Sequence, residues 1–438
     1  MRYPSMLYTP LLWALCGLSS VHAFDLTQAW QAAKAYSADY AAAQYGRDAE
    51  AEQKHQARAA LLPQISANAQ YQKQPASLSS NTQSRGWNIQ ANQVLFDKSR
   101  WSQYQQGKLA EQIADSKLVN SETELLLKVA EAYFDVLLQQ DKLLAIRDEK
   151  TAYEQQLKQA IALFHKGAAT IVDTHEAQAG YDTALAKEIA THNQLLVARN
   201  SLADLTGLDA KEIRRLKRGL LNDLLNNTSE QYWQDLAQQH NPEWQLQKLT
   251  HQQAEEGINT AKGNHLPKLN LSGGYQNHHN TQQYGGNEQH YRSKGGTFTL
   301  QLTVPLYNGG QINSQVREAV AKAAQQQELL TAAERKVKLA IKQAYRTTIG
   351  HRYQILAQQR LLETNQAKLA STQLGRKVGV RTHLELIQAQ QAKAEAEQKL
   401  AEAKYAYLMA YIQLLHHAGI LIETKQQQEL LVLFDKKA

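Results

Sequence analysis

Residues 62–73 read LPQISANAQYQK, and residues 266–276 read LPKLNLSGGYQ. After each Leu-Pro pair, apolar and uncharged polar side chains alternate, which is the period of a strand with two different faces. The same alternation recurs twice more, so the sequence predicts four strands, at 64–73, 86–95, 268–276 and 296–305. Each is about ten residues long, the length that a tilted strand needs to cross a bilayer. Their amide- and hydroxyl-rich faces are suited to lining a watery lumen.

The two pairs of strands belong to two halves of an internal repeat. Residues 94–97, VLFD, correspond to residues 305–308, PLYN, and residues 205–207, LTG, correspond to residues 417–419, HAG. A repeat of this length predicts two equivalent structural units. We place the first repeat at 24–219 and the second at 220–419, followed by a C-terminal tail at 420–438. Each repeat is expected to hold a helical segment, two strands and two long helices.

The helices are predicted to be unusually long. Residues 76–241 and 306–438 contain no proline in a helix interior and are rich in Ala, Gln, Leu, Glu and Lys, which favour helices. From Lys98 to Phe164 no residue signals a stop, so one helix of about 100 Å is expected at about 1.5 Å per residue. An Ala-rich seam with coiled-coil spacing runs from Leu386 to Leu414, and a matching seam runs from Thr174 to Leu202. Small seam residues favour a thin helical wall over a solid core.

The first residues predict a secretory signal. Arg2 precedes the apolar run 11–18, which is too short to span a bilayer, and Val21-His22-Ala23 has the small residues expected at a signal-peptidase cleavage site. The predicted signal is therefore 1–23. The alternative is lipid attachment at Cys16, but Leu15 occupies a position where a small residue is expected. Cys16 is the only cysteine, which excludes disulfides in the mature chain.

Composition and motifs narrow the classes of function. The formal charge of +7 is spread along the chain without a dense basic cluster, which argues against nucleic-acid binding. No phosphate-binding glycine loop or nucleophile motif is present, so the chain is not predicted to be an enzyme, and no cofactor or metal is expected. His278, His279 and His290 fall in a segment, 277–295, that we interpret as a polar external loop rather than a metal site.

Four strands cannot close a transmembrane barrel, since such barrels begin at about eight strands. If the strands span a membrane, the chain must oligomerise, and three copies would give twelve strands around an open bore. The alternative is a soluble periplasmic coiled-coil scaffold without transport activity. That alternative accounts for the helices but not for four bilayer-length strands at matching places in both halves.

Several segments occur in the order found in one known family. They are ARAALLPQISANAQY, VLFDKSRW, AYFDVLLQQDKL, FHKGAATIVDTHEAQAGYDTALA, HLPKLNLSGGY, LTVPLYNGGQINSQV and KVGVRTHLELIQAQ. Together they resemble the TolC family of outer-membrane channel proteins over nearly the whole mature chain. The resemblance implies an α+β membrane protein, in which a homotrimer forms a twelve-stranded β-barrel continuous with a long α-helical coiled-coil tunnel in the periplasm.

The resemblance also implies a function and partners. Such a protein is the exit duct of a tripartite system for type I secretion or multidrug efflux. It would pass secreted protein or small toxic compounds outward as a passive pore. The implied partners are a periplasmic adaptor protein, an inner-membrane transporter (ABC or proton-driven) and outer-membrane lipid.

The turns 164–170 and 374–382 join the longest helices and should lie at the periplasmic mouth. By resemblance, Glu385 matches a ring of carboxylates, whereas Gln388 replaces the acid expected at the next ring position. Three Glu385 carboxylates around an axis would raise one another's pKa and attract cations. Asp173 matches the acidic partner of a latch across the mouth, and we predict that it pairs with Arg376.

Two further expectations concern these turns. Arg381 matches the basic partner of the family and is expected to bond a neighbouring carbonyl or acid. Gly167, Gly375 and Gly379 are expected to permit tight turns, between which adaptor hairpins would dock.

Overall fold

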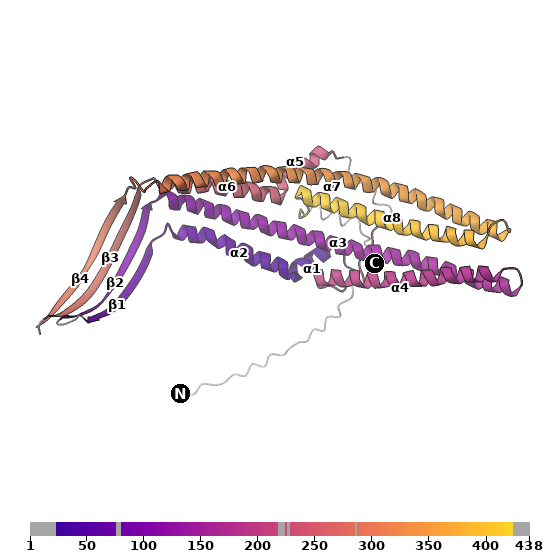
Figure 1. The fold of residues 1–438 in the computed structure, drawn as a ribbon, viewed down its shortest axis with the longest axis horizontal. Helices are drawn as coiled ribbons and strands as arrows, with labels where there is room; N and C mark the ends of the chain where they lie inside the picture. The colour runs from indigo at the N-terminus through magenta and orange to yellow at the C-terminus, as the bar shows by residue number, and fades with distance from the viewer. Residues whose placement is uncertain (1–22, 76–79, 218–223, 226–227, 285–286, 424–438) are drawn as a thin grey trace, which may run out of the picture.

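The computed structural model describes residues 23–75, 80–217, 224–225, 228–284 and 287–423. The predicted signal, apart from Ala23, and most of the predicted tail lie outside the described residues. A sheet forms one end of the molecule, and two long helical hairpins reach from it to the opposite end (Figure 1). The candidate mouth therefore lies at the end farthest from the strands.

The two halves of the chain repeat one order of elements, as the sequence predicts. The first half contains α1 (Leu26–Tyr36), α2 (Ala38–Ala59), β1 (Gln64–Pro75), β2 (Ser80–Phe96), α3 (Lys98–His165) and α4 (Ile171–Thr206). The second contains α5 (Glu230–His240), α6 (Pro242–Gly263), β3 (Lys268–Tyr284), β4 (Asn287–Thr303), α7 (Gln311–Lys377) and α8 (His383–Ala418). Corresponding helices match in length: α3 and α7 have 68 and 67 residues, and α4 and α8 both have 36.

The strands form one antiparallel sheet in the order β1-β2-β3-β4. Its register sorts the side chains as the alternation predicts. Ile65 pairs with Ala91, Ala91 with Gly273, and Gly273 with Phe298, all on the apolar face. The opposite face carries the polar side chains of neighbouring positions, which are Ser66, Asn68, Gln70, Asn88, Gln90, Asn270, Ser272, Thr297 and Thr299. The sheet thus has one apolar face and one face of mostly uncharged polar side chains across all four strands.

The strands are longer than predicted, and the predicted loop 277–295 is wrong. β2, β3 and β4 each have 17 residues, and the β3–β4 pairing continues to Tyr284 and Asn287. Beyond the apolar band both faces are polar, so the alternation fades while backbone pairing continues. Successive residues of a strand face opposite sides, which separates His278 from His279. Among the described residues, no group of three His, Cys, Asp or Glu side chains is arranged to hold a metal ion.

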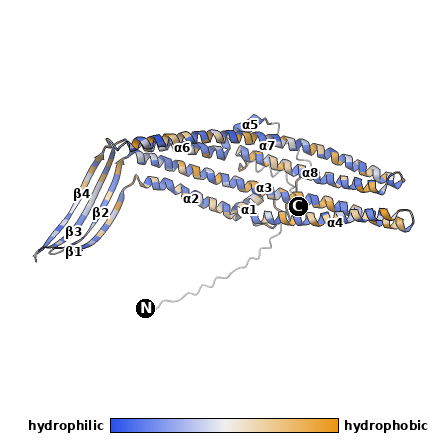
Figure 2. Ribbon diagram, viewed as in Figure 1, coloured by the Kyte–Doolittle hydropathy of each residue, from blue (hydrophilic) through white to orange (hydrophobic). Residues whose placement is uncertain are grey.

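The helices pack along the predicted small-residue seams. On α8, Ala389, Ala396, Ala403 and Ala410 are buried, and on α4, Ala177, Ala184 and Ala198 are buried. Most other helix surfaces are polar, which gives the mixed colouring of Figure 2. No described helix is both long enough and apolar enough to cross a bilayer.

The main apolar core lies where α1 and α5 pack against the long helices. Trp30 of α1 is fully buried there, and its indole Nε1 donates to the carbonyl of Leu126 at 2.8 Å. Tyr133 of α3 is buried beside it and donates to the carbonyl of Arg214 at 3.0 Å. This core anchors the long helices near the middle of their length and leaves the tips to smaller contacts.

Candidate functional site

Two short turns close the helical hairpins at the end far from the sheet (Figure 1). Gly167, between α3 and α4, has φ of 71°, and Gly379, between α7 and α8, has φ of 82°. These left-handed conformations favour glycine, because a Cβ would be strained there. Gly375 differs from the expectation, since it lies within the last turns of α7 rather than in the turn. A Cβ at Gly375 would approach Cγ of Arg381 to 2.6 Å, so a larger residue there would displace the Arg381 side chain.

The two predicted acids of the mouth occupy equivalent helix starts. Thr170 caps α4, and its backbone N–H and hydroxyl both donate to the carboxylate of Asp173 at 2.9 Å. Thr382 caps α8, and its backbone N–H donates to Glu385 at 2.8 Å. Each is a capping box, in which the third helical residue bonds back to the cap. Both carboxylates therefore also stabilise the hairpin turn.

Arg381 bonds an acid of its own hairpin. Its guanidinium Nη1 donates to Oε1 of Glu385 at 2.8 Å. The backbone N–H of Thr382, and then Arg381, hold the pKa of the Glu385 carboxyl below its usual range. Within one chain this direction is opposite to the rise predicted for a ring of three acids. Gln388, one turn further along α8, is exposed and adds no charge.

Three ionisable groups from two hairpins converge beside these turns. Arg376 of α7 and Asp173 of α4 attract one another electrostatically, and His383 of α8 interacts with both. Within the described part of the chain, Arg376 makes no side-chain hydrogen bond and no ion pair within 4.0 Å. The predicted Asp173–Arg376 pairing is thus an electrostatic contact between hairpins rather than a direct bond. The backbone N–H of Thr170, and to a smaller extent Arg376, lower the pKa of Asp173.

His383 is a site residue that the sequence does not predict. Its side chain is only 7% exposed, and neither ring nitrogen has a hydrogen-bond partner among the described residues. Burial, reinforced by the nearby Arg376, lowers the pKa of His383, while Asp173 opposes this shift. One signal was available: the equivalent position of the first repeat, 212 residues earlier, is the apolar Ile171. A histidine in place of an apolar residue marks the difference between the two turns.

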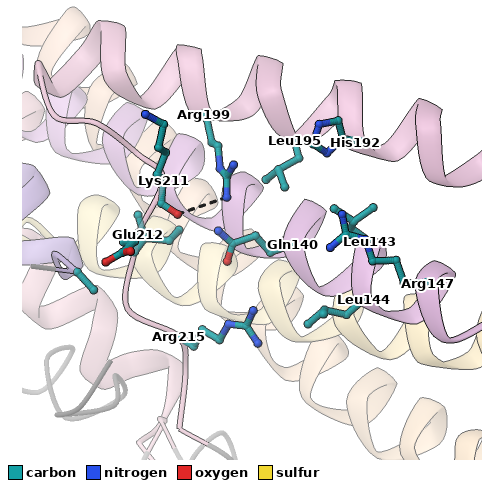
Figure 3. A pocket seen from close by; sticks show the side chains of 12 residues that line it. Gln140, Leu143, Leu144, Arg147, His192, Leu195, Arg199, Lys211, Glu212 and Arg215 are labelled. Carbon is teal, nitrogen blue, oxygen red and sulfur yellow. Dashed lines mark hydrogen bonds between the residues drawn. The ribbon is translucent and has the colours of Figure 1, made fainter. Parts of the chain in front are cut away.

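A separate pocket lies near the middle of the molecule, between α3, α4 and the segment after α4 (Figure 3). It has a volume of about 500 Å³ and a basic lining that includes Arg147, Arg199, Lys211 and Arg215. Arg147 is already paired with Glu188 at 3.0 Å, and Lys211 with Asp209 at 2.9 Å. Two of its four cations therefore have acidic partners of their own, and the pocket is remote from the tips.

Comparisons with known proteins agree with this architecture. The family model described as outer membrane efflux protein matches residues 29–208 and 233–419, one span in each repeat. The chain is 30% identical to the outer membrane protein TolC of Vibrio cholerae, with 92% of this chain and 93% of the relative covered. It is 28% identical to the proteases secretion protein PrtF of Dickeya chrysanthemi, with 98% and 95% covered.

Solved structures show the same fold at lower identity. The chain superimposes on CusC with a TM-score of 0.78 at 16% identity, covering 90% of this chain and 92% of the other. Its TM-score against the CmeC outer membrane channel of Campylobacter jejuni is 0.73 at 15% identity, covering 100% and 98%.

These findings decide between the two hypotheses of the sequence analysis. Members of the family are trimeric, non-enzymatic channels of tripartite systems in the outer membrane. The four-stranded sheet and the paired long helices are the subunit of such a channel, which rules out the soluble periplasmic scaffold. The chain belongs to the outer membrane efflux protein family, as a channel of the outer membrane that serves efflux and secretion.

Proposed function

We propose that the helix tips form a gated periplasmic mouth, and that the chain is a passive duct opened there by its partners. The observation that carries the proposal is the meeting of Asp173 from one hairpin with Arg376 and His383 from the other. Even a direct surface ion pair contributes less than about 1 kcal/mol, and the attraction between Asp173 and Arg376 acts over a longer distance. A latch of this strength can hold the tips together at rest and yield when a partner docks.

We further propose that a periplasmic adaptor docks between the tips and links the duct to an inner-membrane transporter, either ABC-type or proton-driven. Exposed apolar side chains at the turns support a docking role, with Val378 and Val380 being 68% and 74% exposed. Energy would come from the transporter. The relatives named above include a protease secretion protein, so secreted protein is one candidate cargo beside small toxic compounds.

Glu385 is proposed to contribute to a carboxylate ring in the trimer. Its contact with Arg381 partly neutralises it, and Gln388 supplies no second ring. Any preference of the mouth for cations would therefore be modest and would rest on one carboxylate per chain.

The experiment is single-channel conductance of the purified protein in a planar bilayer. Asp173→Ala and Arg376→Ala, each of which removes one side of the latch, should raise the conductance. Glu176→Ala, which removes an acid of the same helix one turn further on, is the matched control and should leave it unchanged. Equal conductance in all four proteins would refute the latch.

The same measurement tests the carboxylate ring. Glu385→Gln should weaken the preference of the channel for cations, and unchanged selectivity would show that Glu385 does not set that preference.

We also propose that the mature chain begins near Phe24 and that the repeats meet near residues 219–220. Phe24 is buried, its carbonyl accepts the N–H of Arg214 at 3.0 Å, and Asp25 forms an ion pair with Arg214 at 3.1 Å. The residue after the predicted cleavage site is thus held by the end of the first repeat. The intact mass of the purified protein measures the cleavage position directly.

A further inference from the structure

The charged residues of the sheet are distributed unevenly between its faces. The described strand residues include five Lys or Arg, which are Lys73, Arg85, Lys268, Arg292 and Lys294. Lys268, at the periplasmic end of the polar face, lies 3.5 Å from Asp97. The register places the other four on the apolar face, near the external end of the sheet. A water-filled lumen accepts charge readily, whereas a lipid-facing surface accepts it only near the interface.

The register brings these cations together. Arg85 pairs with His279, and His279 pairs with Arg292, so the three side chains stand in one row on adjacent strands. Neighbouring strands are about 4.8 Å apart, which places the two arginines roughly 10 Å from each other with the histidine between them. Lys294 lies in the row below and Lys73 in the row above, on the same face. We call these five residues the cationic patch.

The cationic patch begins where the apolar band ends. Leu302, Leu300 and Phe298 are 63%, 60% and 77% exposed on this face. Leu302 and Arg292 are ten residues apart on β4, which is about 34 Å along the strand, or about 25 Å across a bilayer at the usual tilt. Trp87, in the row below Arg85, contacts Tyr275 with ring centroids 5.7 Å apart, and such aromatic residues mark the interface. The patch therefore lies at headgroup level in the outer leaflet.

Among the described residues, no acid contacts the cationic patch. Arg85, Arg292, Lys294 and Lys73 are exposed, and among the described residues none of the five side chains makes a hydrogen bond or an ion pair. The nearest acid on this face of the described strands is Glu288, two rows beyond Arg292. Arg85 and Arg292 lie in one row on the two strands that flank β3, and like charges on one face repel one another unless an anion lies between them. Two guanidinium groups can bind phosphate oxygens in bidentate fashion.

We propose that the cationic patch binds the phosphate groups of a phosphorylated glycolipid of the outer leaflet, with Arg85 and Arg292 as the principal ligands. The acyl chains of the same lipid lie against the apolar band formed by Ile89, Phe298 and their neighbours. A phosphorylated lipid can contact both the cationic patch and the apolar band, whereas free phosphate can contact only the cations. The external end of the channel is thus fixed at a defined depth in the membrane.

The experiment uses the purified protein in detergent and counts bound lipid by native mass spectrometry. The probe is bis-phosphorylated lipid A, and the same lipid without its phosphates is the comparison. Arg85→Gln combined with Arg292→Gln should weaken binding of the phosphorylated lipid by roughly tenfold or more. The matched control is Arg317→Gln combined with Arg335→Gln, which removes two exposed arginines of α7 and should bind as the unaltered protein does.

Several results would contradict binding of the lipid phosphates by the cationic patch. Equal binding of the two lipids by the unaltered protein would show that the apolar band alone retains them, and would overturn the role of the cations. Displacement of lipid A by millimolar inorganic phosphate would identify a free-anion site instead. Should the glutamine variant not fold, Arg85→Lys with Arg292→Lys keeps the charge and loses the bidentate geometry. Full affinity in a folded variant of either kind would overturn the assignment of the ligands.

Discussion

At the scale of single residues, the tip of the second hairpin holds a buried histidine where the first has the apolar Ile171. His383 lies at the start of α8 with neither ring nitrogen bonded, close to Arg376 and Asp173. A buried imidazole beside a guanidinium resists protonation. Burial and the nearby Arg376 thus lower the pKa of His383, so the folded tip favours its neutral form.

We predict that acid loosens this tip through His383. Because its pKa is lowered in the folded protein, the unfolded state binds more protons once the pH falls below about 6.5, and folding then loses stability. The loss is at most about 1.4 kcal/mol per pH unit for one group. Asp173 acts at lower pH, since its lowered pKa gives stability that disappears only as that carboxyl protonates.

The measurement is hydrogen exchange of residues 370–390 at pH 5.5 and 7.5. We expect lower protection of these amides at pH 5.5 than at pH 7.5, each relative to the intrinsic exchange rate at that pH. His383→Leu, which places an apolar residue there as at Ile171, should remove most of this loss of protection. His175→Leu, a change at an exposed position on α4, is the control and should keep the pH dependence. Identical behaviour of the His383 variant and the unaltered protein would exclude this histidine as the cause.

At the scale of elements, the sequence predicts the strands where one face is apolar and fails where both faces are polar. Alternation places Ile65 and Phe298 on one face correctly, because burial against lipid demands it. It does not reveal that β3 continues through Asn280, where water can solvate both faces. The site shows the same division. The capping residues Thr170 and Thr382 are readable from local sequence, but the approach of Asp173 to His383 joins residues about 210 positions apart in the chain.

The register predicts opposite effects for two neighbouring substitutions in β2. Ile89→Lys places a charge on the lipid-facing side of the sheet and should destabilise the folded channel by about 2–4 kcal/mol. Asn88→Lys places the same charge on the polar face, where water solvates it, and should change stability by less than about 1 kcal/mol. Urea unfolding from phospholipid vesicles measures both. A larger effect at Asn88 would mean that the polar face is the one turned to lipid.

At the scale of the whole molecule, the two repeats form helical hairpins of nearly equal length. α3 and α7 differ by one residue in length, so the two turns reach the same level and bring Asp173 beside Arg376. The match follows from the repeat, which the sequence reveals through corresponding segments 204 to 212 residues apart. The closeness of the two tips does not follow from either repeat alone.

Shortening one hairpin should therefore do more damage than shortening both. Deleting seven residues from each arm of the α3–α4 hairpin lowers its tip by about 10 Å. That change separates Asp173 from Arg376, and we expect a higher resting conductance in a planar bilayer. The matched deletion in α7–α8 as well should bring the tips level again and restore the lower conductance. A closed channel with only one hairpin shortened would show that the resting state does not depend on contact between the tips.

The polar face of the sheet has a consequence for cargo. Apart from Lys268 at its edge and His278 further along β3, the described strand residues of that face offer chiefly amides and hydroxyls. A passing molecule exchanges each hydrogen bond with the wall for an equivalent one with water, so it meets neither a deep trap nor a repelling charge. Such a surface binds no class of cargo strongly and therefore does not select among them. Choice among cargoes then belongs to the machinery that delivers them, and a single duct can serve substrates as unlike as a protein and a small molecule.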